Sequence, residues 1–333
     1  MDENWEILIH KFRKLGGLVE NIDLKKGEFG RGIFSINPNK KAQIFIPRNL
    51  MIKINDIDMN KNKLFIKEKN HQDKDKIEFF NFYLDKFSLD FKTREEIYNF
   101  EKNLILFSSN IKLLIKKYLF LEIKENHEGS LDKTLLNSFI ESRKFRFYGS
   151  SMICPILDLI NHKVNSKPFL ISKNGIKTPN YKPFNGELTH NYGCQGSIKR
   201  FFQYKFISLE PKVFSFPFSI KLNEEGIILI CKGNDTYNKI LSVKKYQNKI
   251  IIDGLLIADK IQQELPSQYF RKLLKNINIP SILYREVIKY NLAIRKMMKK
   301  ELKYLDNKTS KNISEILDYE IGLIISNLEI EKS

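Results

Sequence analysis

Two short blocks near the middle of the chain carry residue types that could do chemistry. Asn161-His162 follows a short apolar run, and Asn191-Tyr192-Gly193 closes a stretch that alternates like a strand. A histidine at such a place could ligate a metal or act as a general base, although a lone histidine is more often a structural hydrogen bonder. A tyrosine at a strand end could equally pack into the core with its hydroxyl bonded. The residue types alone leave these alternatives open.

The spacing of the other histidines and of the cysteines does not indicate a metal site. The remaining histidines offer no ligand spacing: His10, His71, His127 and His190. The cysteines are widely spaced and form no Cys-x-x-Cys pair: Cys154, Cys194 and Cys231. We therefore expect no metal site and no disulfide framework. We expect His190, which alternates with Tyr192, on the surface of a strand.

A glycine-rich turn near the N-terminus offers a second kind of chemistry. Gly30-Arg31-Gly32 places two glycines one residue apart, so the backbone there could approach a ligand closely and present N–H groups to an anion. A plain β-turn explains the pair about as well. No amphipathic helix opens after the turn, which argues against a dinucleotide-binding fingerprint.

The first half of the chain predicts strands followed by helices. Residues 1–15 predict a short amphipathic helix, and residues 18–52 predict short strands broken by turns. Residues 52–76 are polar and are expected to form a loop with a short element. Apolar residues recur at helical spacing over residues 76–146, with a break before residue 131.

The second half returns to strands and then to helices. We expect strand-like pieces over residues 168–192, a helix over 196–206, and strands over 213–220 and 226–230. Pro217 predicts that the first of these last two strands lies at a sheet edge or is interrupted. The chain is predicted to be mainly helical from residue 238 to the end, with strong segments at 281–305 and 312–328. The order of elements predicts an α+β fold.

The composition predicts a folded protein with an excess of positive charge. The chain has 333 residues, of which 42% are hydrophobic and 29% charged, and its formal net charge is +18. This length is enough for two domains. Such a charge could indicate an anionic partner such as nucleic acid. We favour a bias of genome composition, because lysines are scattered along the chain. We expect no nucleic-acid partner, since no reading motif is present.

The sequence carries no recognisable targeting or membrane-spanning segment. Its start is unlike a signal peptide because acids stand at Asp2, Glu3 and Glu6. No apolar run is long enough to cross a bilayer. We therefore expect an intracellular, cytoplasmic protein without membrane contact.

The order of the motifs resembles the SET-domain protein methyltransferases. The glycine turn and the helical stretch are followed by Ser-Arg-x-Phe at 142–145, Pro-x-x-Asp-x-x-Asn-His at 155–162 and Gly-Glu-Leu-x-x-Asn-Tyr-Gly at 186–193. A predicted helix then ends near Tyr204-x-Phe206. The resemblance spans nearly the whole chain. It is to the group typified by the Rubisco large-subunit lysine methyltransferase, which also includes the actin histidine methyltransferase.

This resemblance implies an α+β architecture with two domains. Residues 1–208 would form a β-rich SET domain with a pseudoknot-like core and a helical insert at about 60–140. Residues 209–333 would form a mainly helical C-terminal domain that docks a protein substrate. We expect the protein to act as a monomer.

The resemblance also implies a cofactor, S-adenosylmethionine, and a set of site residues. The matching cofactor positions are Gly30, Arg31, Gly32, Arg143, Asp158, Asn161, His162 and Tyr192. Tyr192 would be the catalytic tyrosine, Tyr204 would line the target side-chain channel and count with it as catalytic, and Phe206 and Gln195 would shape that channel. Arg143 would contact the cofactor's carboxylate as a charged donor.

The implied activity is methyl transfer to a lysine nitrogen of a protein partner. Two alternatives stay open: a histidine target, or a non-catalytic binding module with the same fold. Phe29 supports the second alternative, because the family often has an acid there, and here Glu28 stands one residue earlier. Gln195 bears on the first, because the histidine-methylating member has an arginine at that place.

Overall fold

The computed structural model describes residues 2–28, 30–67, 73–123, 130–179, 181, 183–193, 195–221, 228–233, 242–274 and 282–330. Phe29 and Cys194 lie outside the described residues, so the expectation attached to Phe29 is not addressed by the structure. The chain forms two compact units, which we describe one at a time. The first consists of Met1–Tyr98 and Glu128–Tyr192, and the second of Asn99–His127 and Gly193–Ser333. These units are defined by packing, and the predicted domain boundary at residue 208 stays a prediction.

The first unit contains the strands that come before and after the helical part of the chain. Those before it are β1 (Leu18–Glu20), β2 (Ile22–Gly27), β3 (Gly30–Ser35), β4 (Gln43–Pro47), β5 (Ile52–Lys53), β6 (Ile57–Asn60) and β7 (Lys63–Ile66). Those after it are β8 (Phe145–Phe147), β9 (Ser150–Ile153), β10 (Asn161–His162), β11 (Leu170–Ser172), β12 (Gly175–Lys177) and β13 (Thr189–His190).

Early and late strands interleave in the sheets of this unit. One sheet has the order β1-β4-β12-β11, in which the early strand β4 pairs antiparallel with the late strand β12. A second sheet has the order β5-β9-β8. β10 and β13 form a short parallel pair, and β2 and β3 form a hairpin. Side chains alternate along β4, so Ile44 and Ile46 are completely buried and pack in the hydrophobic core.

The helices of the first unit complete its core. α1 (Glu3–Lys14) starts at the capping side chain of Asp2 and buries Trp5, Leu8, Ile9 and Phe12, as the sequence predicted. α2 (Lys74–Tyr83) runs into a π-helical turn, η4 (Leu84–Ser88), and α5 (Leu131–Arg143) precedes β8. α3 (Phe91–Ile105) begins in this unit and ends in the second.

The polar stretch after β5 is more regular than the sequence predicted. Residues 52–76 were expected to be a loop with a short element, yet β6 and β7 form an antiparallel hairpin there. Lys61 and Asn62 take left-handed φ values of 48° and 63°, which suit a tight hairpin turn. Met59, Leu64 and Ile66 are buried, so alternating apolar positions drive the pairing within a lysine-rich segment.

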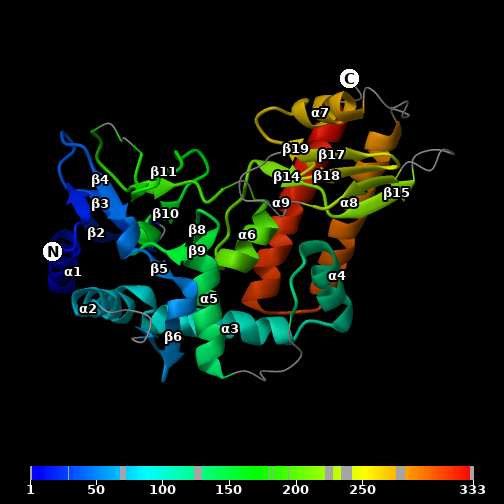
Figure 1. Ribbon diagram of the computed structural model, residues 1–333. Coiled ribbons are helices and arrows are strands. Elements are labelled where there is room, and N and C mark those ends of the chain that lie inside the picture. Colours follow the sequence, from blue (N-terminus) through cyan, green and yellow to red (C-terminus); the bar gives the residue numbers. More distant parts are fainter. Residues whose placement is uncertain are drawn as a thin grey trace. The chain divides into compact units, whose positions relative to one another are not determined.

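The second unit combines a helix pair with small sheets. Its helices are α4 (Ser109–Leu119), α6 (Ser197–Tyr204), α7 (Leu265–Leu274), α8 (Ile282–Leu302) and α9 (Lys308–Ile330). Its strands are β14 (Lys212–Phe214), β15 (Phe218–Lys221), β16 (Ile228–Cys231), β17 (Ser242–Tyr246), β18 (Lys249–Asp253) and β19 (Leu256–Asp259). α8 and α9 pack side by side, in orange and red in Figure 1.

The predictions for this unit were right for the helices and wrong for one segment. α6, α8 and α9 lie where helices were expected. Pro217 separates β14 from β15, so the predicted strand is interrupted there. β15 is also an edge strand of its sheet, as the proline predicted. Residues 242–259 form three strands although that part was predicted to be mainly helical. Ile250 and Ile252 are buried at alternate positions of β18, which is a strand pattern.

The described residues therefore confirm the predicted α+β class. Helices and several small sheets occur in both units. Within the described part of the chain, no helix combines the length and the apolar character that crossing a bilayer requires.

Candidate active site

A single extended segment of the first unit brings the chemically interesting blocks together. Residues 186–190 run beside β3, where the Leu188 N–H donates to Ile33 O at 2.7 Å. The same segment pairs with β10, with Asn161 opposite Thr189 and His162 opposite His190. The glycine turn, the Asn-His block and Tyr192 therefore share one neighbourhood.

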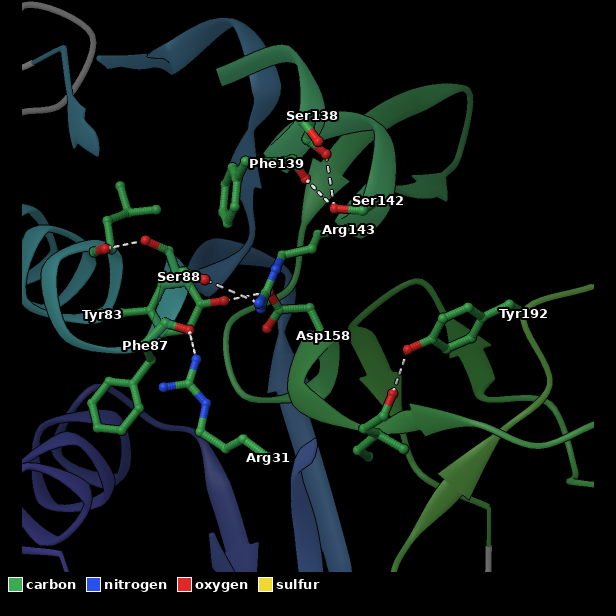
Figure 2. A network of polar contacts seen from close by, with 12 residues as sticks. Arg31, Tyr83, Phe87, Ser88, Ser138, Phe139, Ser142, Arg143, Asp158 and Tyr192 are labelled. Carbon is green, nitrogen blue, oxygen red and sulfur yellow. Dashed lines mark hydrogen bonds and ion pairs between the residues drawn. The ribbon is translucent and has the colours of Figure 1, made fainter. Parts of the chain in front are cut away.

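Tyr192 is held at both ends. Its hydroxyl donates to the main-chain carbonyl of Ile160 at 2.8 Å, as Figure 2 shows. Its backbone N–H donates to Nδ1 of His162 at 3.1 Å, and the two rings pack with centroids 5.1 Å apart. Nδ1 must be unprotonated to accept that hydrogen bond, so the proton of a neutral His162 lies on Nε2. His162 serves here as an acceptor that orients the tyrosine.

Asn161 is held by an acid that the sequence analysis did not single out. Its Nδ2 donates to Oε1 of Glu187 at 2.6 Å and to the carbonyl of Arg31 at 3.2 Å. Burial raises the pKa of Glu187, and the charge of Glu28 adds to that shift while the Asn161 hydrogen bond opposes it. Glu187 is the acid of the Gly-Glu-Leu block, and this block is the only sequence feature that could have drawn attention to it. Its partner Asn161 is 26 positions away in the sequence, so the contact could not be predicted.

A buried ionic cluster lies around Asp158. Arg143 Nη1 donates to Asp158 Oδ2 at 3.0 Å, Arg143 Nη2 donates to Ser88 O at 3.1 Å, and Tyr83 donates its hydroxyl to the same Asp158 Oδ2. Figure 2 shows Tyr83 and Arg143 pointing toward Asp158 from different elements. Burial raises the pKa of Asp158, and Arg143 opposes that shift. Burial also raises the pKa of Tyr83, which the sequence analysis did not single out.

Arg31 adds a second guanidinium to this region. Its Nη2 donates to Phe87 O at 2.6 Å, and the group lies over the Phe87 ring at 5.9 Å from the centroid. Burial lowers the pKa of Arg31, and the charge of Arg143 lowers it further. The charges of Asp90 and Asp158 oppose these two effects, so two carboxylates face the two guanidinium groups in this region. In addition, the buried Oδ1 of Asp158 has no hydrogen-bond partner among the residues that the structure describes.

His190 is not a surface residue, so that prediction was wrong. The side chain is buried at 8% exposure. Its ring stacks on Phe169 with centroids 3.7 Å apart and planes at 7°. Burial lowers its pKa to about 4. The alternation rule failed because the strand is two residues long and Phe169, from outside the strand, covers this position.

The remaining candidates belong to the second unit, in and around α6. The Gln195 side chain donates through Nε2 to Gln203 Oε1 at 3.0 Å. Its own Oε1 is buried and has no hydrogen-bond partner within the described part of the chain. The Tyr204 and Phe206 rings pack with centroids 5.9 Å apart. Their expected place beside Tyr192 in a substrate channel stays a prediction.

Arg200 of α6 forms a buried ion pair that no sequence motif indicated. Arg200 is fully buried and pairs with Glu210 at 2.8 Å. It also donates through Nη2 to Gly193 O at 2.8 Å, so it anchors the turn that follows Tyr192 in sequence. In the parts of the chain that the structure describes, no group of three or more His, Cys, Asp or Glu side chains could hold a metal ion.

The fold is that of the SET-domain methyltransferases of the Rubisco large-subunit group, as the motif order predicted. The structure of Rubisco LSMT bound to AdoMet is similar with a TM-score of 0.50 and 12% sequence identity, covering 99% of this chain and 92% of that one. The SET domain of LSMT bound to lysine and AdoHcy gives a TM-score of 0.49 and 13% identity, with 99% and 91% covered. No protein-family model and no curated protein sequence matches the chain.

Proposed function

We propose that the chain is an S-adenosylmethionine-dependent protein lysine methyltransferase, with Tyr192 as its catalytic tyrosine. The observation that carries the proposal is the placement of Tyr192: its hydroxyl is bonded to the carbonyl that directly precedes Asn161-His162. The fold shared with an enzyme whose structure contains AdoMet supports the same activity. Lysine as the target rests on the motif resemblance.

The side chains of the first unit fit the proposed cofactor. Arg31 would be the cation that faces the ligand's carboxylate, with Arg143 as a second cation in the same region. The unpartnered Asp158 Oδ1 could accept a hydrogen bond from a donor of the ligand. A methyl group added to Cα of Gly30 would meet nothing within 4 Å, so the turn is open on that side. Asn161 and His162 would hold the amino-acid and adenine ends.

The residues of the chain would act mainly by orientation. The bound cofactor would supply a methyl group that is already activated on a sulfonium. Tyr192 donates its hydroxyl proton to Ile160 O, and a phenolic oxygen that donates is also able to accept, so it would steer a target N–H or a methyl C–H. Holding the reacting groups in line can be worth up to about 7–11 kcal/mol. A dry channel would lower the pKa of the target lysine and favour its neutral form.

The partner of this proposal is a lysine-bearing protein. The C-terminal domain would dock it, and the enzyme would act in the cytoplasm as a monomer without nucleic acid. These statements rest on the sequence alone. A histidine target would keep the fold, the cofactor and the role of Tyr192. A non-catalytic module would keep only the fold.

Transfer of labelled methyl to proteins of a cell extract tests the role of Tyr192. We expect Tyr192→Phe to reduce labelling by about 10²-fold or more, the usual effect of removing one preorganised polar group at a reacting centre. Tyr181→Phe is the matched control, since its hydroxyl also donates to a carbonyl at 2.8 Å, that of Thr189. The control should label within about threefold of wild type.

Two outcomes of that experiment would count against the proposal. Equal labelling by wild type and Tyr192→Phe would contradict the catalytic role proposed for Tyr192. No labelling by any protein, together with no uptake of S-adenosylmethionine in calorimetry, would favour the non-catalytic module.

A further inference from the structure

We propose that Glu187 is a positioning residue that sets the orientation of the Asn161 side-chain amide, so that Asn161 offers a ligand its carbonyl oxygen and not its NH2 group. The ligand group that this oxygen would accept is the α-ammonium of S-adenosylmethionine. The inference therefore rests on the proposed function and adds to it a residue outside the matched cofactor positions.

The orientation of the amide follows from its neighbours. An asparagine amide has two N–H donors on Nδ2 and an acceptor on Oδ1. Nδ2 donates both to Glu187 Oε1 and to Arg31 O. A main-chain carbonyl and a carboxylate can only accept, so the flipped amide would set Oδ1 against two oxygens. The two donors are thus used within the protein, and Oδ1 is the atom left for a ligand.

The glycine turn makes room for this acid. A methyl group on Cα of Gly32 would lie 2.2 Å from Glu187 Oε1 and 2.7 Å from Asn161 Nδ2. One on Gly27 would meet the Phe34 ring at 2.5 Å before it met Glu187 Oε2 at 3.1 Å. Gly32 of β3 therefore leaves room for the Glu187 carboxylate, whereas Gly30 faces open space. The Glu187 carboxylate therefore fits closely into the space between Gly32 and the Asn161 amide.

The backbone holds Glu187 in that place. Glu187 forms a bridge with Phe34 of β3, and the hydrogen bonds on either side join Leu188 to Ile33 and Ser35 to Gly186. The carboxylate is also a source of negative charge next to the turn, together with Glu28. An ammonium group at Asn161 Oδ1 would be stabilised by that charge.

The test measures dissociation constants by calorimetry, with S-adenosylhomocysteine and with its analogue that carries hydrogen in place of the α-amino group. Glu187→Leu removes the acceptor, and Glu187→Gln keeps one. We expect Glu187→Leu to weaken S-adenosylhomocysteine by about tenfold or more, as for a hydrogen bond to a charged group. Binding of the deaminated analogue should change less than about threefold, and Glu187→Gln should retain most of the preference for the amino group.

A second pair of variants tests the same point if Glu187→Leu does not fold. Asn161→Asp places an oxygen against the Glu187 carboxylate and should weaken S-adenosylhomocysteine. Combining Asn161→Asp with Glu187→Gln restores a donor and an acceptor with the roles exchanged, and binding should recover at least in part.

The possible results distinguish a failure of this inference from a failure of the proposed function. Equal loss for both ligands in Glu187→Leu would show a merely structural role and overturn the inference. Unchanged binding of S-adenosylhomocysteine to Glu187→Leu, or no recovery in the double variant, would also overturn it. Failure of the folded wild type to bind S-adenosylhomocysteine would instead overturn the proposed function.

Discussion

At the scale of single residues, the site is a chain of oriented hydrogen bonds. His162 accepts from the backbone of Tyr192, Tyr192 donates to the carbonyl before Asn161, and Asn161 donates to Glu187. Each of these hydrogen bonds fixes the donor and acceptor roles of the two groups that it joins. His162 looked in the sequence like a possible metal ligand or base, and its geometry instead makes it a support for the tyrosine.

Substitutions at His162 separate these two roles. Asn can offer Oδ1 close to the place of Nδ1 and so accept from the Tyr192 N–H, whereas Ala cannot. We expect His162→Asn to retain methyl transfer within about tenfold of wild type and His162→Ala to lose about 10²-fold, in kcat/KM with saturating cofactor. Equal loss in both variants would restore the general base as the better account.

Because His190 is buried in its neutral form, we expect the free energy of unfolding to fall as the pH is lowered. Its folded-state pKa of about 4 lies below the ordinary 6.5, so between these values the unfolded chain binds the proton and the folded chain does not. The contribution is fully present above about pH 6.5 and is lost as the pH falls toward 4, by up to about 3 kcal/mol.

Denaturant unfolding at pH 7 and pH 4.5 checks this contribution. Replacing His190 by Phe, which can keep the stacking on Phe169, should flatten the fall in the free energy of unfolding. Exposed His10→Gln is the control and should leave the fall unchanged. The same pH dependence in all three proteins would argue against the buried, neutral His190.

At the scale of elements, α8 and α9 are joined by a buried ion pair. Arg295 Nε donates to Glu320 Oε2 at 2.8 Å, with both side chains at most 2% exposed. Arg295 also donates to Phe214 O at 3.0 Å and lies over the Phe216 ring at 4.2 Å. Burial lowers the pKa of Arg295, and the Glu320 charge opposes that shift. The pair links the helices to β14.

Removing one partner of this pair should be costly. Glu320→Ala would leave a buried guanidinium without its carboxylate, and we expect it to lower the free energy of unfolding by about 3–5 kcal/mol. Asp318→Ala is the matched control on the same helix, because it removes an ion pair with Lys299 whose side chains are 45% and 54% exposed. The control should cost less than about 1 kcal/mol. Similar losses in denaturant unfolding would contradict the buried pair's role.

Some of these elements could be predicted from the sequence and others could not. The apolar spacing of Trp5, Leu8, Ile9 and Phe12 is local and predicted α1 correctly. The β6–β7 hairpin was hidden by lysines at its exposed positions, and β18 by a run of isoleucines that carries no clear period. Glu187 could not be predicted as the partner of Asn161, because that contact depends on the pairing of segments distant in sequence.

At the scale of the whole molecule, the order of motifs was more informative than the composition. The net charge of +18 pointed to no particular partner. The ordered blocks predicted the fold that the chain shares with Rubisco LSMT at 12% identity. In this fold the early strand β4 pairs with the late strand β12, so the blocks must stand in a fixed order along the chain. Roles of single residues do not follow from fold alone.

The proposed activity of the whole molecule is methyl transfer to a lysine of a protein partner. The most direct measurement is mass spectrometric mapping of the residue that the wild-type protein labels in extract from its source organism, with S-adenosylmethionine as methyl donor. We predict methylation on a lysine side-chain nitrogen that is absent with Tyr192→Phe. Methylation mapped to histidine, or no protein methylation at all, would contradict it.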